Sequence, residues 1–378
     1  MHGRPVVEET IAYVGLDTDK AGIDVAVAEG VIGGEVRYFG RIANTAEALM
    51  AMVKKLQANG RRLMVCYEAG PCGYGIHRRL NARPGVSCQV VAPSMVPRRP
   101  GDRVKTNRRD ALKLAKLYRA GELSPVWVPD ATHEAIRDLV RSRGQAMADL
   151  TRHRQRISSF LLRQEISYPP GKKAWTRMHR AFLADQKFAF PAQQLMWTEL
   201  LTALDQAKAR LQRLDGLIGE QVAGWSLAWL VEALQALRGF GRLHATLLAA
   251  EIGDPRRFAS PTPLMAYLGL TPSEDSTGEK RRRGRLTKTG NTRVRKLLIE
   301  AAWTYARSAK PAEPANPPPP ALALIADKAR DRLSRRYKKL LANGKIPTVA
   351  IAAVARELVG FVWAITHAAA PGAAQIAA

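Results

Sequence analysis

Four oxygen-bearing residues stand where a catalytic site at the edge of a sheet would need them. Asp17 and Glu68 each follow an apolar run that reads as a strand, and Asn107 and Asp110 lie one turn apart at the start of a basic helical stretch. Clustered carboxylates repel one another unless cations neutralise them, and oxygen ligands suit Mg²⁺, the ion that organises in-line phosphoryl transfer. We therefore predict a Mg²⁺ site at Asp17, Glu68, Asn107 and Asp110. Taken singly, each acid is explained better by a helix cap or a surface charge.

The charge balance predicts a polyanionic partner. The 378 residues include 59 Lys and Arg against 33 Asp and Glu, a formal net charge of +26. Charge alone does not separate DNA from RNA or from an anionic membrane face, and a solvated basic surface is the alternative for each cluster. Because aromatic residues make up only 6% of the chain, grip on the phosphate backbone is favoured over base stacking. The predicted nucleic-acid contacts are Arg98, Arg99, Arg103, Lys105, Arg108 and Arg109 in one cluster, and Lys280, Arg281, Arg282, Arg283, Arg285, Lys288, Arg293 and Arg295 in the other.

The elements that position the acids are predicted by periodicity and by glycine punctuation. Three apolar runs suggest a strand meander, which is followed by a helix at 46–56 that Asn44 could cap with Glu47. Strands and helices then alternate up to residue 120, giving the order β-β-β-α-β-α-β-α. This is the order of ribonuclease-H-like folds, in which the strands that end at Asp17 and Glu68 are neighbours. The predicted elements are strands at 11–16, 23–28, 36–42, 63–67 and 88–92 and helices at 46–56, 74–80 and 110–120.

The rest of the chain reads as mostly helical. Long helices at about 132–163 and 192–218 are predicted to form an antiparallel hairpin, a coiled-coil dimer or an ordinary bundle. Short helices at 227–237 and 244–251 flank Gly239 and Gly241, which resembles a helix-hairpin-helix whose glycine amides approach a phosphate; a plain interhelical turn is the alternative. The run 311–320 is a proline-rich loop, and helices at 321–342 and 346–364 follow it.

Several classes of protein are disfavoured by the sequence. The three cysteines are odd in number and lack a metal-binding spacing, so we expect neither zinc nor disulfides. The apolar stretch 349–365 is interrupted by Arg356 and Glu357, and the N-terminus lacks the order of a signal peptide. We therefore expect a soluble cytoplasmic protein that has no membrane partner.

Short motifs in both halves of the chain carry a family resemblance. They are YVGLDT at 13–18, YEAG at 67–70, KTNRRDA at 105–111, EIGD at 251–254, YLGLTP at 267–272 and KTGN at 288–291. The first three resemble the N-terminal motifs of the DEDD transposases, the bridge-RNA-guided insertion-sequence recombinases that include pilin-gene invertases. The last three are similar to that family's C-terminal transposase domain and follow in the expected order, so the resemblance spans about residues 10–305.

The resemblance implies a fold and a set of site residues. It implies a RuvC-like domain that binds Mg²⁺ through Asp17, Glu68, Asp110 and the residue at 107, where Asn107 replaces the family's usual Asp. It also implies a serine nucleophile in the C-terminal domain. An ungapped alignment puts Thr277 in that slot and Ser276 one residue earlier, and we favour Ser276 because a primary alcohol is less hindered. The alternative is a polar turn that caps a helix.

These inferences define an expected organisation and function. We expect a RuvC-like domain at 1–125, helical coiled-coil arms at 126–225 and a mostly helical C-terminal transposase domain at 226–378. The resemblance implies a DNA recombinase that acts on target and donor DNA, is guided by a noncoding bridge RNA and works as a dimer or tetramer. The alternatives are a metal-dependent junction nuclease that needs no serine and, because of Asn107, a non-catalytic nucleic-acid-binding remnant.

Overall fold

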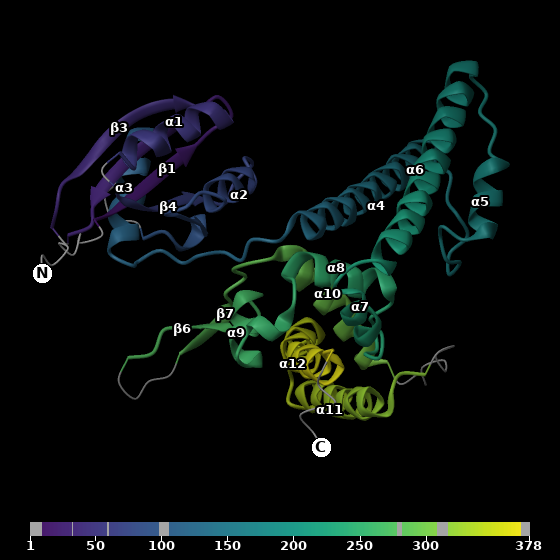
Figure 1. The fold of residues 1–378 in the computed structure, drawn as a ribbon. Coiled ribbons are helices and arrows are strands. Elements are labelled where there is room, and N and C mark those ends of the chain that lie inside the picture. The colour runs from purple at the N-terminus through teal and green to yellow at the C-terminus, as the bar shows by residue number, and fades with distance from the viewer. Residues whose placement is uncertain are drawn as a thin grey trace, which may run out of the picture. The chain divides into compact units, whose positions relative to one another are not determined.

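The chain folds into two compact units that divide between residues 128 and 129, and each is described by itself. The computed structural model describes residues 10–31, 33–58, 60–97, 106–277, 282–307 and 317–371. Figure 1 shows the first unit as a sheet with helices and the second as an assembly of helices with one hairpin of strands.

A five-stranded sheet with the order β3-β2-β1-β4-β5 forms the first unit. The first three strands pair antiparallel, whereas β1, β4 and β5 run parallel, so the predicted meander and the parallel crossovers are confirmed. Every predicted strand forms within two residues of its expected bounds. The strands are β1 (Ile11–Thr18), β2 (Gly22–Glu29), β3 (Val36–Ala43), β4 (Arg62–Glu68) and β5 (Val86–Val91).

Helices cover both faces of this sheet. Apolar residues of α1 (Ala46–Leu56) and α2 (Gly75–Asn81) share one core cluster with the sheet, and α3 (Asn107–Arg119) packs on the other face; a 3₁₀ turn, η1 (Pro93–Met95), follows β5. Gly15 lets α3 approach β1, because a Cβ at this position would lie 2.9 Å from the Leu114 Cβ. The predicted cap of α1 is wrong: the side chain of Thr45 accepts the amide of Ala48, and Asn44 instead donates to the carbonyl of Asp19.

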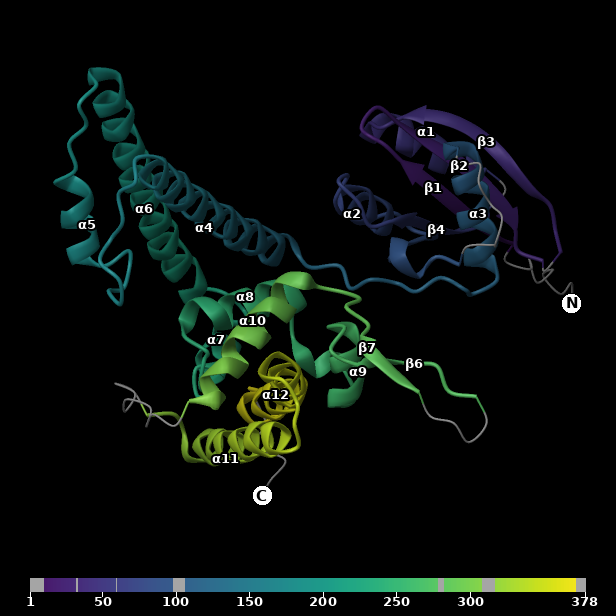
Figure 2. The same cartoon turned by 180° about the vertical axis from the view of Figure 1, so that it is seen from behind.

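A helical arm begins the second unit. The helices α4 (Ala131–Arg163) and α6 (Pro191–Ala223) pack side by side, and the connection between them contains α5 (Arg177–Ala184), which the sequence did not predict (Figure 2). The ion pair of Arg143 with Asp215 and the stacking of Phe160 on Trp197 show that the two long helices run antiparallel within one chain. The intramolecular hairpin is thus the arrangement seen.

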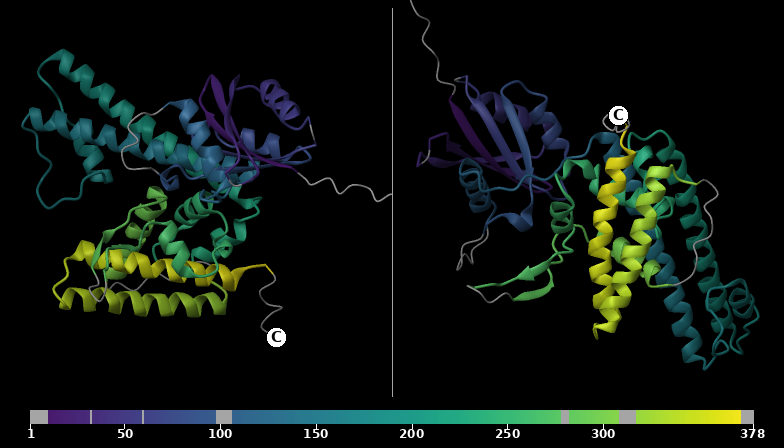
Figure 3. Two further views of the ribbon diagram at one scale, coloured as in Figure 1. Left: turned by 90° about the vertical axis from the view of Figure 1, so that its left-hand side faces the viewer. Right: turned by 90° about the horizontal axis from the view of Figure 1, so that it is seen from below.

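The remaining helices share one apolar core with the base of the arm. The helix α12 (Pro347–Ala369) has the length and apolarity of a membrane span, but Val354, Leu358 and Ile365 are fully buried. The helix α11 (Pro320–Ala342) lies along it (Figure 3). It is therefore a core helix in this fold. The elements are α7 (Ala228–Leu234), α8 (Arg242–Ile252), η2 (Pro255–Arg257), α9 (Pro261–Tyr267), β6 (Pro272–Glu274), β7 (Arg283–Leu286), α10 (Thr292–Trp303), η3 (Thr304–Ala306), α11 (Pro320–Ala342) and α12 (Pro347–Ala369).

Candidate active site

Three predicted acids lie at one edge of the sheet, on the face that α3 covers. Asp17 and Glu68 lie at the carboxyl ends of the neighbouring parallel strands β1 and β4. Because side chains alternate along a strand, Asp17 is on the same face as Gly15, and Glu68 is on the same face as Cys66, whose thiol contacts the carbonyl of Leu114 on α3. Asp110 lies in the first turn of α3 and is half-buried, as are the other two acids.

Two further acids at this edge were missed by the sequence analysis. Asp24 pairs with Asp17 across β1 and β2, so it occupies the same face, and it is only 5% exposed. Its carboxylate accepts hydrogen bonds from Tyr38 (2.6 Å) and Arg41 (2.8 Å). Asp19 accepts the backbone amide of Gly22 and the guanidinium of Arg41, and these two interactions lower the pKa of its carboxyl. Asp24 stands out in the sequence as an acid within an apolar strand, but its pairing with Asp17 could not be predicted from the sequence.

Asn107 is placed differently from the acids. It is the first residue of α3 after the cap Thr106, is exposed, and its amide donates to Asp19 at 3.4 Å. In this geometry Asn107 tethers the start of α3 to the β1–β2 turn.

The donor set fits a hard divalent cation by its chemistry. Carboxylates at the ends of two neighbouring strands and in the first turn of one helix lie on the same side of the sheet, and hard oxygen donors are the ligands that Mg²⁺ selects. Among the described residues, however, no group of three or more His, Cys, Asp or Glu side chains is close enough together to hold a metal ion. The edge therefore offers ligands of a suitable kind, but the described side chains do not form a complete metal site.

The predicted nucleophiles lie on a β-hairpin in the second unit. Ser276 follows β6, is exposed and donates a hydrogen bond of 3.1 Å to the carboxylate of Glu274. The strands pair antiparallel, with Glu274 opposite Arg283, so the alternative of a helix cap is wrong for this segment. Thr277 is also exposed and is the last described residue before a gap at 278–281. Glu274 is a further functional candidate that the sequence analysis missed, although it lies only two residues from Ser276.

Close backbone contacts fix the base of this hairpin. Gly269 and Gly290 both have positive φ, and a Cβ at either position would overlap the backbone of the opposite loop. The guanidinium of Arg295 donates to the carbonyls of Leu268 (3.0 Å) and Thr289 (2.8 Å), which ties the two loops together. The prediction of Arg295 as a nucleic-acid contact is wrong, because its side chain is buried in these bonds.

A buried ion pair anchors the same loops to the arm. The Glu251 side chain is 1% exposed and accepts two hydrogen bonds of 2.9 Å from Arg141 on α4 and one of 2.7 Å from Asn291, the cap of α10. Burial alone would raise the pKa of Glu251, but the bonds from Arg141 and Asn291 outweigh it, so the pKa is lowered. The EIGD and KTGN segments are thus joined through Glu251 and Asn291.

The other predicted basic contacts divide into exposed side chains and positions outside the described residues. Arg108 is exposed and lies over the ring of Tyr38, with 5.1 Å to the centroid, and Arg109 is exposed beside it. Lys288 is exposed in the loop that follows the hairpin and has a positive φ of 55°. Arg282, Arg285 and Arg293 are also exposed, whereas Arg98, Arg99, Arg103, Lys105, Lys280 and Arg281 and the side chain of Arg283 lie outside what the structure describes.

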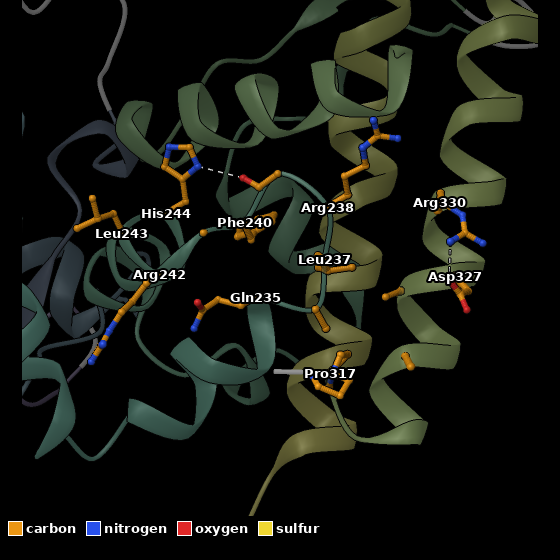
Figure 4. Close-up of a pocket in the computed structure, with 16 residues that line it drawn as sticks. Gln235, Leu237, Arg238, Phe240, Arg242, Leu243, His244, Pro317, Asp327 and Arg330 are labelled. Atoms are coloured by element: carbon orange, nitrogen blue, oxygen red, sulfur yellow. Dashed lines mark hydrogen bonds and ion pairs between the residues drawn. The ribbon is translucent and has the colours of Figure 1, made fainter. Parts of the chain in front are cut away.

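The turn between α7 and α8 lines a cavity of about 1120 Å³ (Figure 4). Gly239 has a φ of 88°, and a Cβ there would lie 2.8 Å from the Cα of Ala301 on α10, so this glycine serves packing. Gly241 is exposed and is the N-cap of α8, so no side chain of the cap residue accepts a hydrogen bond from the first amides of that helix. Arg238 and Arg242 lie on the same turn, and His244 contacts the carbonyl of Gly239 at 3.0 Å.

The sheet order, with acids at the ends of β1 and β4 and at the start of α3, is consistent with a ribonuclease-H-like domain. A family model of DEDD transposases of the IS110 type, described as Transposase, matches residues 14–165, and the Transposase IS116/IS110/IS902 family model matches residues 231–315. The chain is 46% identical over 372 residues to "Putative transposase y4qE" of Sinorhizobium fredii, which covers 97% of this chain and 91% of that protein. It is 29% identical over 347 residues to the transposase for insertion sequence element IS1533 of Leptospira borgpetersenii, which covers 88% of this chain and 97% of that protein. The chain belongs to the IS110 family of DEDD transposases.

Proposed function

We propose that this transposase cuts and rejoins DNA through a composite site that combines Asp17, Glu68 and Asp110 with the hydroxyl of Ser276. The observation that supports it most is the shared edge and face of the three acids, because carboxylates are gathered in this way where they act together on one phosphate. The two groups of residues lie in different compact units, so the site is assembled from both, within one chain or across subunits.

We propose Asp17, Glu68 and Asp110 as Mg²⁺ ligands, with Asn107 contributing its amide oxygen after it leaves Asp19. When bound, the ion would neutralise the carboxylates and polarise the scissile phosphate. Asn107 brings no charge, so we expect weaker metal affinity than an Asp at this position would give. Asp24 is engaged by Tyr38 and Arg41, and its role is to hold the strand ends in place.

The hydrogen bond between Ser276 and Glu274 supports the covalent step. The Ser276 Oγ attacks phosphorus, the bond from phosphorus to one deoxyribose oxygen breaks, and Glu274 accepts the hydroxyl proton while the leaving oxygen takes up a proton. An oxygen of a second strand then attacks the same phosphorus and releases the serine. Thr277 is the alternative nucleophile, and it has the same exposure but a more hindered hydroxyl.

Exposed arginines and lysines at both half-sites would hold the nucleic acids by their phosphates. Arg108 and Arg109 lie beside the acids, and Lys288 lies beside the hairpin. We also propose that the amides of Gly239 and Gly241 contact phosphates of the nucleic-acid backbone. A bridge RNA that pairs with target and donor DNA would supply sequence specificity. We propose that the protein works as a dimer or tetramer on DNA in the bacterial cytoplasm, with a RuvC-like domain at 1–125, coiled-coil arms at 126–225 and a transposase domain at 226–378.

The test is a strand-transfer assay with purified protein, Mg²⁺, the RNA transcribed from the element's noncoding end, and donor and target DNA. We expect Asp17→Asn to lower product formation by at least about 100-fold, since even second-shell changes at metal sites cost about 10–100-fold. Glu47→Gln is the matched control, because Glu47 is an exposed acid on α1, on the opposite face of the sheet. Equal activity of the two variants would refute the acidic site.

A denaturing gel with end-labelled DNA tests the nucleophile. We expect Ser276→Ala to lose the covalent protein–DNA adduct, and Ser273→Ala, on the same hairpin, to keep it. Adduct loss only in Thr277→Ala would move the role to Thr277. Cleavage that survives in the Ser276→Ala, Thr277→Ala double variant would indicate a junction nuclease. If the parent chain forms no recombinant product but Asn107→Asp does, the parent chain is an impaired remnant.

A further inference from the structure

A cavity of about 400 Å³ lies between the three helices of the arm, and none of its lining residues belongs to the proposed active site. Its walls come from α4, α5, α6 and the segment before α5, all within the second unit. Its volume is within the range of about 300–1,000 Å³ that is typical of sites for small ligands. The side chains that line it differ from those of an ordinary helix interface, because they combine arginines with an aromatic ring and a buried histidine.

His179 supplies a buried polar atom that the fold does not satisfy. The residue is 5% exposed and lines the cavity, and its Nδ1 has no hydrogen-bond partner among the described residues. Buried polar atoms are nearly always paired, so His179 has a hydrogen-bonding capacity that a ligand or a water in the cavity could use. Burial lowers the pKa of His179, so its ring is neutral near pH 7 and Nδ1 can either donate or accept.

Trp175 forms an aromatic wall beside this histidine. Its ring lies edge-to-face with His179 at 4.9 Å between centroids, and the guanidinium of Arg154 lies 5.3 Å from its centroid. The backbone of Trp175 has a φ of 64°, which is unusual for a bulky residue and costs conformational energy. Packing around the ring therefore holds it in place against a local preference, as is common at binding sites.

Cations outnumber acids around the cavity. Arg154, Arg177, Arg180 and Lys208 line it, and Asp205 is the one acid among the described lining residues. Asp205 pairs with Arg180 at 2.6 Å, which leaves an excess of positive charge. An anionic group is therefore the favoured occupant of the cavity's rim.

We propose that this cavity binds one unpaired nucleotide of the nucleic acid that the transposase handles. The phosphate would lie among Arg154, Arg177 and Lys208, the base would pack against Trp175, and a polar edge of the base would meet Nδ1 of His179. A paired base in a duplex has both faces covered by its neighbours, so only an unpaired base can reach an aromatic wall in a cavity. This inference goes beyond the proposed strand transfer and does not depend on its chemistry.

The test compares duplexes with and without an unpaired nucleotide. Fluorescein-labelled 30-base-pair DNA, the same duplex with a single-nucleotide bulge, and the RNA versions of both are titrated with the full chain in EDTA, so that no cleavage occurs. We expect Trp175→Leu to weaken binding of a bulged substrate by about tenfold, in line with the loss of one base–aromatic stack, and to leave the perfect duplex unchanged. If Trp175→Leu weakens binding only of the bulged RNA or only of the bulged DNA, that result identifies which nucleic acid supplies the nucleotide.

Two arginines on α4 give a matched pair. Arg154→Gln removes a lining charge, whereas Arg156→Gln removes an exposed charge of the same helix that does not line the cavity. We expect only the first to lose the preference for a bulge, with far-UV circular dichroism showing that both fold. Unchanged preference in both Trp175→Leu and Arg154→Gln would overturn the proposal. The proposal would also be overturned if Trp175→Leu changed the oligomeric state but kept the preference for a bulge, since the cavity would then be a subunit contact.

Discussion

Replacing Arg141 with methionine removes the cation that neutralises the buried carboxylate of Glu251. Arg141 donates two hydrogen bonds of 2.9 Å to this carboxylate, whose side chain is 1% exposed. Methionine keeps much of the apolar stem of the arginine, so the main loss is the charge pair. Asn291 still donates one hydrogen bond of 2.7 Å and thus compensates part of the loss.

The size of the effect follows from the burial of the two partners. Breaking a fully buried ion pair by removing one partner costs about 3–5 kcal/mol of the free energy of unfolding. Here the Arg141 side chain is 38% exposed and Asn291 remains, so we expect about 2–3 kcal/mol at pH 7. In a unit of this size about 2–4 °C of Tm corresponds to 1 kcal/mol, which gives a decrease of about 5–10 °C.

The pH dependence gives this prediction a specific signature. In the parent protein the pKa of Glu251 is lowered, so its contribution to stability is present above the pKa of about 4.3 in the unfolded chain and is lost as the pH falls through the folded pKa. Burial is the largest single influence on Glu251 and raises its pKa. Without Arg141 we therefore expect the carboxyl to take up a proton at a higher pH than in the parent, and its buried charge then no longer costs stability at acid pH. The difference in stability between parent and variant is therefore full at pH 7 and shrinks toward pH 4.

Urea unfolding followed by far-UV circular dichroism at pH 7 and pH 4.5 measures this difference. Arg143→Met is the control, because Arg143 forms a partly exposed pair with Asp215 at 2.7 Å, and we expect a loss below about 1 kcal/mol. The double variant Arg141→Met, Glu251→Gln should recover part of the loss. A loss in Arg141→Met that equals that of Arg143→Met, or that is the same at both pH values, would refute the reasoning.

Three further substitutions test the packing and charge of the proposed active site. Gly15→Ala forces α3 away from β1, because the new methyl group overlaps the carbonyl of Ala111, and we expect about 1–3 kcal/mol less stability in thermal unfolding together with weaker strand cleavage. In Gly290→Ala the new methyl group overlaps the carbonyl of Tyr267, and the φ of 69° is unfavourable for alanine. We expect a similar loss of stability and less adduct on denaturing gels. Asn107→Asp adds a charged ligand, so we expect the Mg²⁺ concentration for half-maximal cleavage to fall by about 3–10-fold in a metal titration.

The architecture of the first unit is predictable because its strands are short apolar runs between glycines. The helix predicted at 46–56 has the bounds Ala46–Leu56 in the structure, yet its cap is Thr45 rather than Asn44. The amide of Asn44 is instead taken by the carbonyl of Asp19, 25 residues away in the chain, at 2.8 Å. Such a long-range bond competes with local capping and leaves no local signal.

The second unit shows where sequence reasoning fails. The strands β6 and β7 have only three and four residues, and neither is apolar enough to show alternation, so the hairpin that carries Ser276 could not be predicted. Arg295 lies in a basic run and reads as a surface charge, but the carbonyls of Leu268 and Thr289 satisfy its guanidinium inside the fold. A buried arginine of this kind is indicated only by acceptors that the tertiary structure brings to it.

The division of the chain at residue 128 has a genetic consequence. The carboxylates belong wholly to one compact unit and the serine hairpin wholly to the other, so we expect a point mutation in one unit to leave the fold of the other intact. If neighbouring copies share their halves, two different dead alleles expressed together would complement each other.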